Sequence, residues 1–146
     1  MKNKKIIIIA EAGINHNNKK NYIKSLIYSA KKIGADYIKF QSYITENLVL
    51  KKTKKTNYQK KNTISKSDQF EMLKKYELSF NMYNFIYREC KKVKIKVLFS
   101  VFDIESFNYL KKTFKINIIK LGSGEITNYS LLKVVAKSGV KVILST

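Results

Sequence analysis

The amino-acid sequence predicts an α/β fold, and three observations lead to that prediction. Short apolar segments alternate with segments whose apolar residues recur at helical spacing. Four of the apolar segments end in polar residues, among them Glu11, Lys39, Ser100 and Lys120. A fifth apolar segment closes the chain with no helix after it. Parallel strands with chemistry at their C-terminal ends are typical of α/β barrels, so we expect about five βα units, the N-terminal portion of a TIM (β/α)8 barrel.

The first βα unit is expected before residue 35. Ile6–Ala10 is a continuous run rich in β-branched residues, which is typical of a strand buried on both faces. Residues Asn21–Ile33 then carry apolar residues at helical spacing, and Gly34 is expected to end that helix. A second strand is predicted over Tyr37–Phe40, which is the spacing of a right-handed parallel crossover.

Residues 42–67 interrupt this pattern with a polar, lysine-rich stretch that is too long for an ordinary connection. Two interpretations stay open, a disordered tract or a functional loop over the mouth of a site, and the aromatic residues Tyr43 and Tyr58 slightly favour the loop. A helix is then predicted from Ser67 to Tyr76, and Ser79 is expected to cap another one.

The rest of the chain predicts three further strands and two helices. The strands are Val97–Phe99, Ile118–Leu121 and Val140–Leu144, and the helices are about Ile104–Phe114 and Ser130–Lys137. No internal boundary is visible, so residues 1–146 are expected to form one unit.

The charge of the chain is strongly basic, with 30 basic and 10 acidic residues and a formal net charge of +20. Such a charge usually suggests a nucleic-acid partner. Here, however, Arg88 is the only arginine, although arginine supplies the bidentate fork that reads bases and phosphates. The lysines are spread as pairs over the polar faces of the expected helices. We therefore expect an attraction for anionic substrates and no dedicated nucleic-acid function.

The sequence also indicates the cellular compartment in which the protein is expected. No apolar stretch approaches the roughly 18 residues of a membrane span, and the start is too short for a secretory signal. The single cysteine, Cys90, cannot form an internal disulfide. We expect a cytoplasmic protein with no membrane partner.

The densest group of candidate residues is Lys120–Glu125, directly after the fourth strand. Two glycines around Ser123 let the backbone approach a ligand and present free amides, which suits phosphate or carboxylate. Lys120 and Ser123 would contact the same anion, while Glu125 could bind a sugar hydroxyl or move a proton. The alternative is an ordinary glycine-containing turn.

The first two strands supply further candidates. Lys39 and Gln41 share one face of their strand, which in a barrel is the interior. Since burying an unpaired lysine is costly, an anion is expected to meet Lys39, unless the pair lies on the outer face of an edge strand. Glu11 is a candidate general base or metal-shell carboxylate. With His16 as its single histidine, the chain cannot build a metal site from histidine ligands alone.

Ser100, Asp103 and Ser145 are individually weak signals, because each alone is more often structural. Their common position strengthens them, since all follow predicted strands at the end where a barrel collects its active site. Lys39, Lys120, Ser123 and Ser145 together predict a pocket for a small anion that bears phosphate and carboxylate.

Six segments, in this order, resemble the N-terminal half of the sialic acid synthase family, which includes N-acetylneuraminate, legionaminate and pseudaminate synthases. They are IIIIAEAGINHN, GADYIKFQSY, SDQFEMLKKYELS, VLFSVFDIES, IIKLGSGEITNYSLL and VILST. The resemblance covers essentially the whole chain. It implies a homodimer whose (β/α)8 barrel is followed by an antifreeze-like domain. It also implies a transferase that condenses phosphoenolpyruvate with an N-acylated hexosamine such as N-acetylmannosamine, using a divalent metal, Mn²⁺ or Mg²⁺.

The resemblance further implies roles for single residues. Residues that match positions holding the phosphate and carboxylate of phosphoenolpyruvate are Lys39, Ser100, Lys120, Ser123 and Ser145. Gln41 and Glu125 match positions facing the acceptor sugar, and Glu125 is also a candidate for proton handling. Glu11 matches an acidic residue near the metal and the reacting carbons.

The chain departs from the family pattern at several points. The usual NHNG loop reads Asn15–Asn18, which predicts a positive φ at Asn18, and the usual STPFD segment reads Phe99–Asp103 without its proline. The resemblance implies that the two metal-binding histidines, strands six to eight and the antifreeze-like domain lie beyond Thr146. We therefore expect an incomplete enzyme. The alternatives are another phosphoenolpyruvate-dependent keto-sugar-acid synthase, or an inactive half-barrel that acts only as an assembly partner.

Overall fold

The computed structural model describes residues 6–50 and 68–146. Five strands form one parallel sheet in sequential order: β1 (Ile9–Gly13), β2 (Tyr37–Ser42), β3 (Lys96–Val101), β4 (Ile118–Leu121) and β5 (Lys141–Leu144). The helices are α1 (Lys20–Lys32), α2 (Thr45–Leu48), α4 (Gln69–Tyr76), α5 (Phe80–Lys92), α6 (Ile104–Phe114) and α7 (Tyr129–Lys137), with a 3₁₀ helix η1 (Ser123–Thr127).

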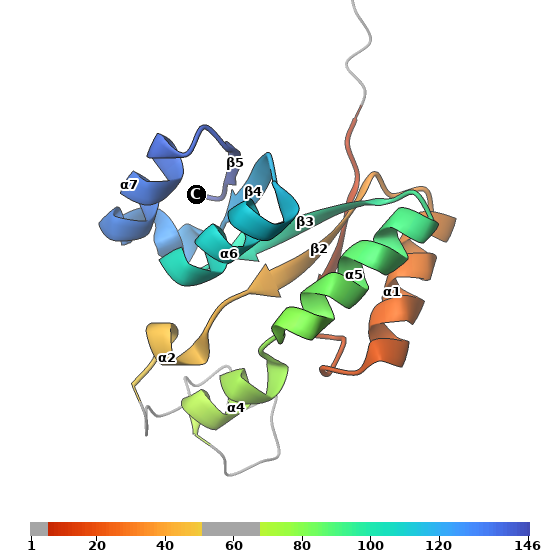
Figure 1. Cartoon of the computed structure of the whole chain (residues 1–146), viewed down its shortest axis with the longest axis horizontal. Helices are drawn as coiled ribbons and strands as arrows, with labels where there is room; N and C mark the ends of the chain where they lie inside the picture. Colours follow the sequence, from red (N-terminus) through yellow and green to blue (C-terminus); the bar gives the residue numbers. More distant parts are fainter. Residues whose placement is uncertain (1–5, 51–67) are drawn as a thin grey trace, which may run out of the picture.

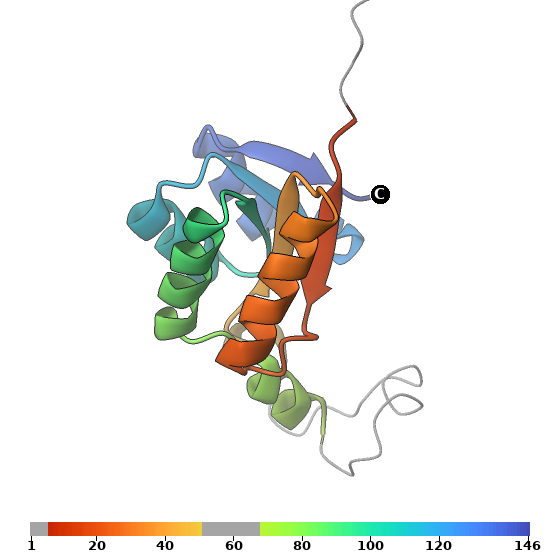
Figure 2. The ribbon, with the colours of Figure 1, turned by 90° about the vertical axis from the view of Figure 1, so that its right-hand side faces the viewer.

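The arrangement of the layers is that of a βα barrel segment. Helices α1, α5, α6 and α7 gather on one side of the sheet, while α2 and α4 lie beyond the C-terminal end of β2 (Figures 1 and 2). A doubly wound sheet would place helices on both faces and would break the sequential strand order. The predicted α/β fold with five strands is therefore confirmed.

The hydrophobic core lies between the sheet and these helices. Along β2, the buried residues Ile38, Phe40 and Ser42 alternate with the half-buried Lys39 and Gln41. The helices complete the core with Ile23, Ile27, Ile86, Phe107, Leu110, Leu131 and Val135. Because successive strand residues point to opposite faces, Lys39 and Gln41 lie together on the face that these helices leave open. The prediction that they share a face is confirmed.

The first strand begins later than the sequence predicts. Ile6, Ile7 and Ile8 are 82%, 61% and 53% exposed, and the strand runs over Ile9–Gly13 instead of Ile6–Ala10. The reason is the partner strand: Ile9 lies opposite Tyr37, the first residue of β2, so the paired register begins at Ile9, although the carbonyl oxygen of Ile8 accepts backbone hydrogen bonds from Asp36 and Tyr37. Propensity for β structure does not make a strand without a neighbour.

The polar stretch after β2 begins with a short helix that the sequence did not predict. Its first part contains α2, and Tyr43 is buried with its hydroxyl donating to the carbonyl oxygen of Leu73 at 3.0 Å. Tyr43 therefore anchors this segment, and the interpretation of residues 42–67 as a loop over a site stays a prediction. Residues 51–67, with Tyr58 and Ser67, lie outside the described residues.

The two helices before β3 begin within two residues of the predicted positions. The helix predicted from Ser67 is α4, which is capped by Asp68. Ser79 occupies the N-cap of α5 as predicted, but its side chain makes no capping hydrogen bond. Throughout residues 6–50 and 68–146, none of the helices combines the length and the apolar character needed to cross a membrane.

Candidate functional site

A row of polar residues crosses the open face of the sheet near its C-terminal end. Glu11 of β1 lies opposite Lys39 of β2, Gln41 lies opposite Ser100 of β3, and Ser100 lies opposite Lys120 of β4. Residues paired across parallel strands project to the same face of the sheet. Five of the eight candidate residues therefore share one surface.

Lys39 forms an ion pair with Glu11, and the two side chains are 15% and 52% exposed. The other oxygen of Glu11, Oε1, accepts a hydrogen bond from the backbone N–H of Gly13 at 2.9 Å. Lys39 is therefore not an unpaired buried charge, because Glu11 supplies a negative charge, and contact of Lys39 with a ligand anion stays a prediction. The same pairing holds Glu11 in place on the strand.

Lys120 is half-buried on the same face, and within the described part of the chain it has no ion pair. Its pKa is lowered from its usual value, first by burial and then by the positive charge of Lys39, while Glu11 opposes the shift. Lys39 and Lys120 are therefore close enough to repel each other. An anion between the two ammonium groups would remove this repulsion.

The segment after β4 is a 3₁₀ helix, and the prediction that its glycines present free amides to an anion stays a prediction. Gly122 and Gly124 do not have a positive φ, and Ser123 is exposed. Glu125 is half-buried, and its Oε2 accepts a hydrogen bond from Nδ2 of Asn128 at 2.7 Å. Asn128 also caps α7 through its Oδ1, which accepts from the N–H of Leu131 at 3.2 Å. Glu125 is thus tied to the start of α7.

Ser145 lies at the same end of the sheet. Its backbone N–H donates to the carbonyl oxygen of Leu121 at 3.1 Å, so it lies beside the last residue of β4. The structure thus brings Glu11, Lys39, Gln41, Ser100 and Lys120 onto one face, with Ser123, Glu125 and Ser145 just beyond the strands.

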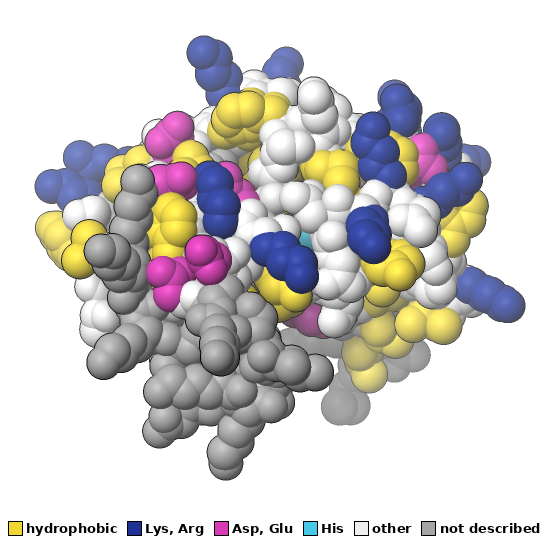
Figure 3. All heavy atoms as spheres, turned by 90° about the horizontal axis from the view of Figure 1, so that it is seen from below, with side chains coloured by type: hydrophobic (Ala, Val, Ile, Leu, Met, Phe, Trp, Pro, Cys, Tyr) yellow, Lys and Arg dark blue, Asp and Glu magenta, His cyan; other side chains and the backbone are white. Residues whose placement is uncertain are grey.

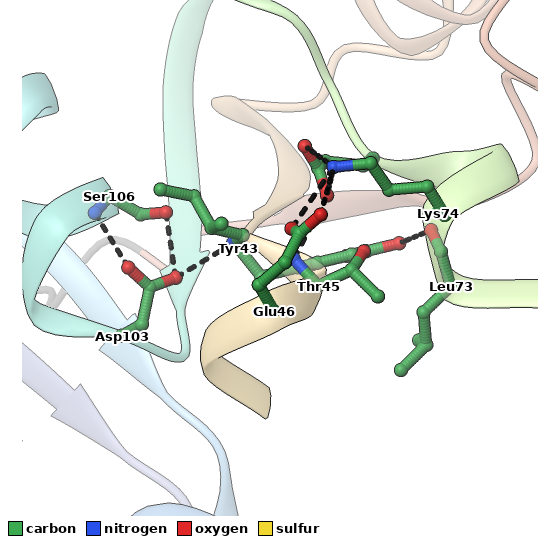
Figure 4. Close-up of polar contacts among 9 residues, drawn as sticks. Tyr43, Thr45, Glu46, Leu73, Lys74, Asp103 and Ser106 are labelled. Atoms are coloured by element: carbon green, nitrogen blue, oxygen red, sulfur yellow. Dashed lines mark hydrogen bonds and ion pairs between the residues drawn. The ribbon is translucent and has the colours of Figure 1, made fainter. Parts of the chain in front are cut away.

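The sequence did not predict the set of contacts that fixes the segment directly after β2. Asp103 accepts hydrogen bonds from the backbone N–H of Ile44 at 2.9 Å and from the N–H and Oγ of Ser106 at 2.8 and 2.7 Å (Figure 4). On the other side, Glu77 accepts from the N–H of Thr45 at 2.9 Å. The spacing of Asp103 before α6 signals a helix cap, but nothing in the sequence signals its bond to Ile44.

Charge is unevenly distributed on the end of the molecule to which β1 and β2 run. Seen from below, acidic side chains gather on one part of this end, while lysines are scattered over the rest (Figure 3). Lys74 pairs with both Glu46 and Glu77 at 3.0 Å. This end therefore offers both cationic and acidic surfaces.

His16 is a buried loop residue with one of its ring nitrogens bonded to the backbone. It is 1% exposed, its Nδ1 accepts a hydrogen bond from the N–H of Asn18 at 2.9 Å, and burial lowers its pKa. The predicted positive φ at Asn18 is confirmed at 54°, and Asn17 has a φ of 46°. In the described ranges, no group of three or more His, Cys, Asp or Glu side chains could hold a metal ion. These residues alone therefore do not fit the divalent metal that the resemblance implies.

Comparison with known proteins agrees with this geometry. The NeuB family matches residues 26–146. Over 98% of its length the chain is 43% identical to the N,N'-diacetyllegionaminic acid synthase of Campylobacter jejuni, and over 95% it is 39% identical to the synthase of the same name from Legionella pneumophila. It spans 42% and 39% of those two proteins.

Solved structures show the same relationship. The N-acetylneuraminic acid (sialic acid) synthetase of Leptospira borgpetersenii, crystallised with citrate, aligns with a TM-score of 0.79 at 29% identity. The alignment covers 97% of this chain and 45% of that one. The predicted fold, part of an α/β barrel, is confirmed by this alignment.

Proposed function

Because the chain belongs to the NeuB family, we propose that it is the N-terminal part of a synthase that condenses phosphoenolpyruvate with an N-acylated hexosamine. The products would be a nine-carbon sugar of the sialic acid type and phosphate. The observation that carries this proposal is the pair of ammonium groups of Lys39 and Lys120 on one sheet face, where Lys120 lacks a carboxylate partner within the described ranges.

In the proposed reaction, Lys39 and Lys120 hold the phosphate and carboxylate of phosphoenolpyruvate, and the hydroxyls of Ser100, Ser123 and Ser145 add hydrogen bonds. Fixed cations on these oxygens would stabilise the negative charge that develops as the reaction proceeds. Both lysines lie in the half-buried layer of the sheet, where such charges act more strongly than in bulk water.

The acceptor sugar would lie toward Gln41 and Glu125. The enol carbon attacks the aldehyde carbon of the open-chain sugar, and the aldehyde oxygen takes up a proton, for which Glu125 is the proposed donor. Water then adds to the former enol carbon, and the carbon–oxygen bond to phosphate breaks. Glu11 would act through its pairing with Lys39, close to the reacting carbons.

The proposal extends to the whole enzyme. The rest of the barrel, an antifreeze-like domain and a homodimer would complete the site, and the enzyme would work in the cytoplasm. The Mn²⁺ or Mg²⁺ of the family would need ligands from outside these residues.

Calorimetric titration of the 146-residue chain with phosphoenolpyruvate tests the anion site. We expect saturable binding that weakens about 10-fold or more in Lys120→Ala, because a hydrogen bond to a charged group contributes about 1.5–3 kcal/mol. Lys112→Ala is the matched control, since Lys112 is an exposed lysine on α6. Absence of saturable binding, or an equal loss in both variants, would refute the proposal.

A further inference from the structure

A cavity opens at the end of the sheet where β2, β3 and β4 begin, which is the end of β2 away from α2 (Figure 1). Its volume is about 660 Å³, within the roughly 300–1,000 Å³ of small-molecule sites. The cavity is lined by α5, by the end of α6 and by the first residues of the three strands. None of the eight candidate residues lines it, so the cavity is separate from the proposed phosphoenolpyruvate site.

Most of the cavity wall is apolar or aromatic. The rings of Tyr87 on α5 and Phe114 on α6 stack with their centroids 3.9 Å apart and their planes within 4° of parallel. The other apolar residues of the wall include Tyr37, Ile95, Ile116 and Ile118, which are buried or half-buried. Since aromatic rings favour offset stacking with other flat groups, this wall suits a ligand with a flat, apolar body.

The rim of the cavity is positively charged. Each charged residue that lines it is a cation, namely Arg88, Lys91, Lys96 and Lys115, and all four are exposed. Arg88 lies 3.7 Å from a carboxylate oxygen of Glu89, whereas Lys91 and Lys115 make no ion pair within residues 6–50 and 68–146.

The ends of α5 and α6 account for only part of this positive charge. A helix C-terminus carries about half a negative charge, and lysines in the last turn complement it. The two helix ends together therefore oppose about one of the four positive charges at the rim. The excess that is left favours a ligand with a negative charge.

We infer that the cavity is a binding site for a small organic anion with a flat, apolar body and one carboxylate or phosphate group. The body packs on the stacked rings of Tyr87 and Phe114, and the anionic group lies at the rim near Lys91 and Lys115. Burial of the apolar body supplies most of the affinity, because exposed ion pairs contribute little. The cations select the sign of the ligand's charge. The inference is independent of the proposed function, since the two sites share no residue.

The test is an NMR titration of the 146-residue chain, with ¹³C-labelled isoleucine methyl groups, using 1-naphthoate as the probe. We expect saturable shifts at Ile95, Ile116 and Ile118, while Ile23 and Ile27, which lie in the core under α1, keep their positions. Acetate should cause no shifts, because it lacks the apolar body. 1-Naphthylmethylammonium, with the same rings and the opposite charge, should bind about 3- to 10-fold more weakly.

Charge reversal at the rim gives a matched pair of variants. Lys91→Glu should weaken 1-naphthoate binding about 3- to 10-fold, because it replaces an attraction by a repulsion. Lys32→Glu is the control, since Lys91 and Lys32 are both exposed lysines in the last turn of a helix and Lys32 does not line the cavity.

Four results would overturn the inference. They are an absence of saturable shifts at the three cavity isoleucines, equal affinities for the anionic and cationic probes, equal losses in Lys91→Glu and Lys32→Glu, and a loss in Lys120→Ala as large as that in Lys91→Glu. The last result would place the probe in the proposed phosphoenolpyruvate site. Failure of phosphoenolpyruvate to bind refutes the proposed function and leaves these expected results unchanged.

Discussion

Replacing Asp103 with alanine should destabilise the protein far more than loss of an ordinary helix cap. Asp103 is 6% exposed, caps α6 through the N–H of Ser106, and also accepts from the N–H of Ile44. Loss of a cap costs about 1 kcal/mol. Asp103→Ala would also remove the partner of the part-buried N–H of Ile44 and of the buried hydroxyl of Ser106, and a buried polar group left without a partner costs about 1–3 kcal/mol. We therefore expect the free energy of unfolding to fall by about 2–4 kcal/mol in Asp103→Ala.

Asp68→Ala is the matched control for this prediction. Asp68 caps α4 by accepting from the N–H of Glu71 at 2.8 Å, and that bond is exposed, so its loss should cost about 1 kcal/mol or less. Urea unfolding followed by circular dichroism measures both values. At about 3 °C per kcal/mol for a chain of this size, the midpoint of thermal unfolding should fall by about 6–12 °C in Asp103→Ala. Equal losses in the two variants would show that the bond to Ile44 contributes nothing.

Three further outcomes are expected. Glu11→Gln should tighten phosphoenolpyruvate binding several-fold by calorimetry, because it frees the charge of Lys39; weaker binding would contradict this. The affinity for phosphoenolpyruvate, measured by calorimetry, should weaken as pH rises through the lowered pKa of Lys120, because the bound anion favours the protonated amine. Lys120→Arg should move this decline to higher pH, because arginine stays protonated. Burial raises the pKa of the Cys90 thiol to about 12. A thiol reagent at pH 8 should therefore modify Cys90 only when the chain is unfolded in urea. Rapid modification of the folded chain would refute the burial of Cys90.

The sequence predicted most of the fold because apolar periodicity records which residues avoid water. Ile118–Leu121 and Ile104–Phe114 have the bounds that the pattern indicated. The predicted bounds of the first strand were wrong because they depend on where β2 begins. Short helix α2 was missed because its four residues are too few to show a period.

For the candidate site, the sequence by itself determined which residue types follow each strand, and hence that cations, carboxylates and hydroxyls gather at one end of the sheet. Only the tertiary structure decided how they pair: Lys39 with Glu11, Glu125 with Asn128, and Asp103 with the backbone of Ile44. The physical reason is the distance along the sequence over which each kind of information acts. Periodicity acts within one element, whereas an ion pair or a cap between elements depends on the register of neighbouring strands and on the position of loops far apart in the chain.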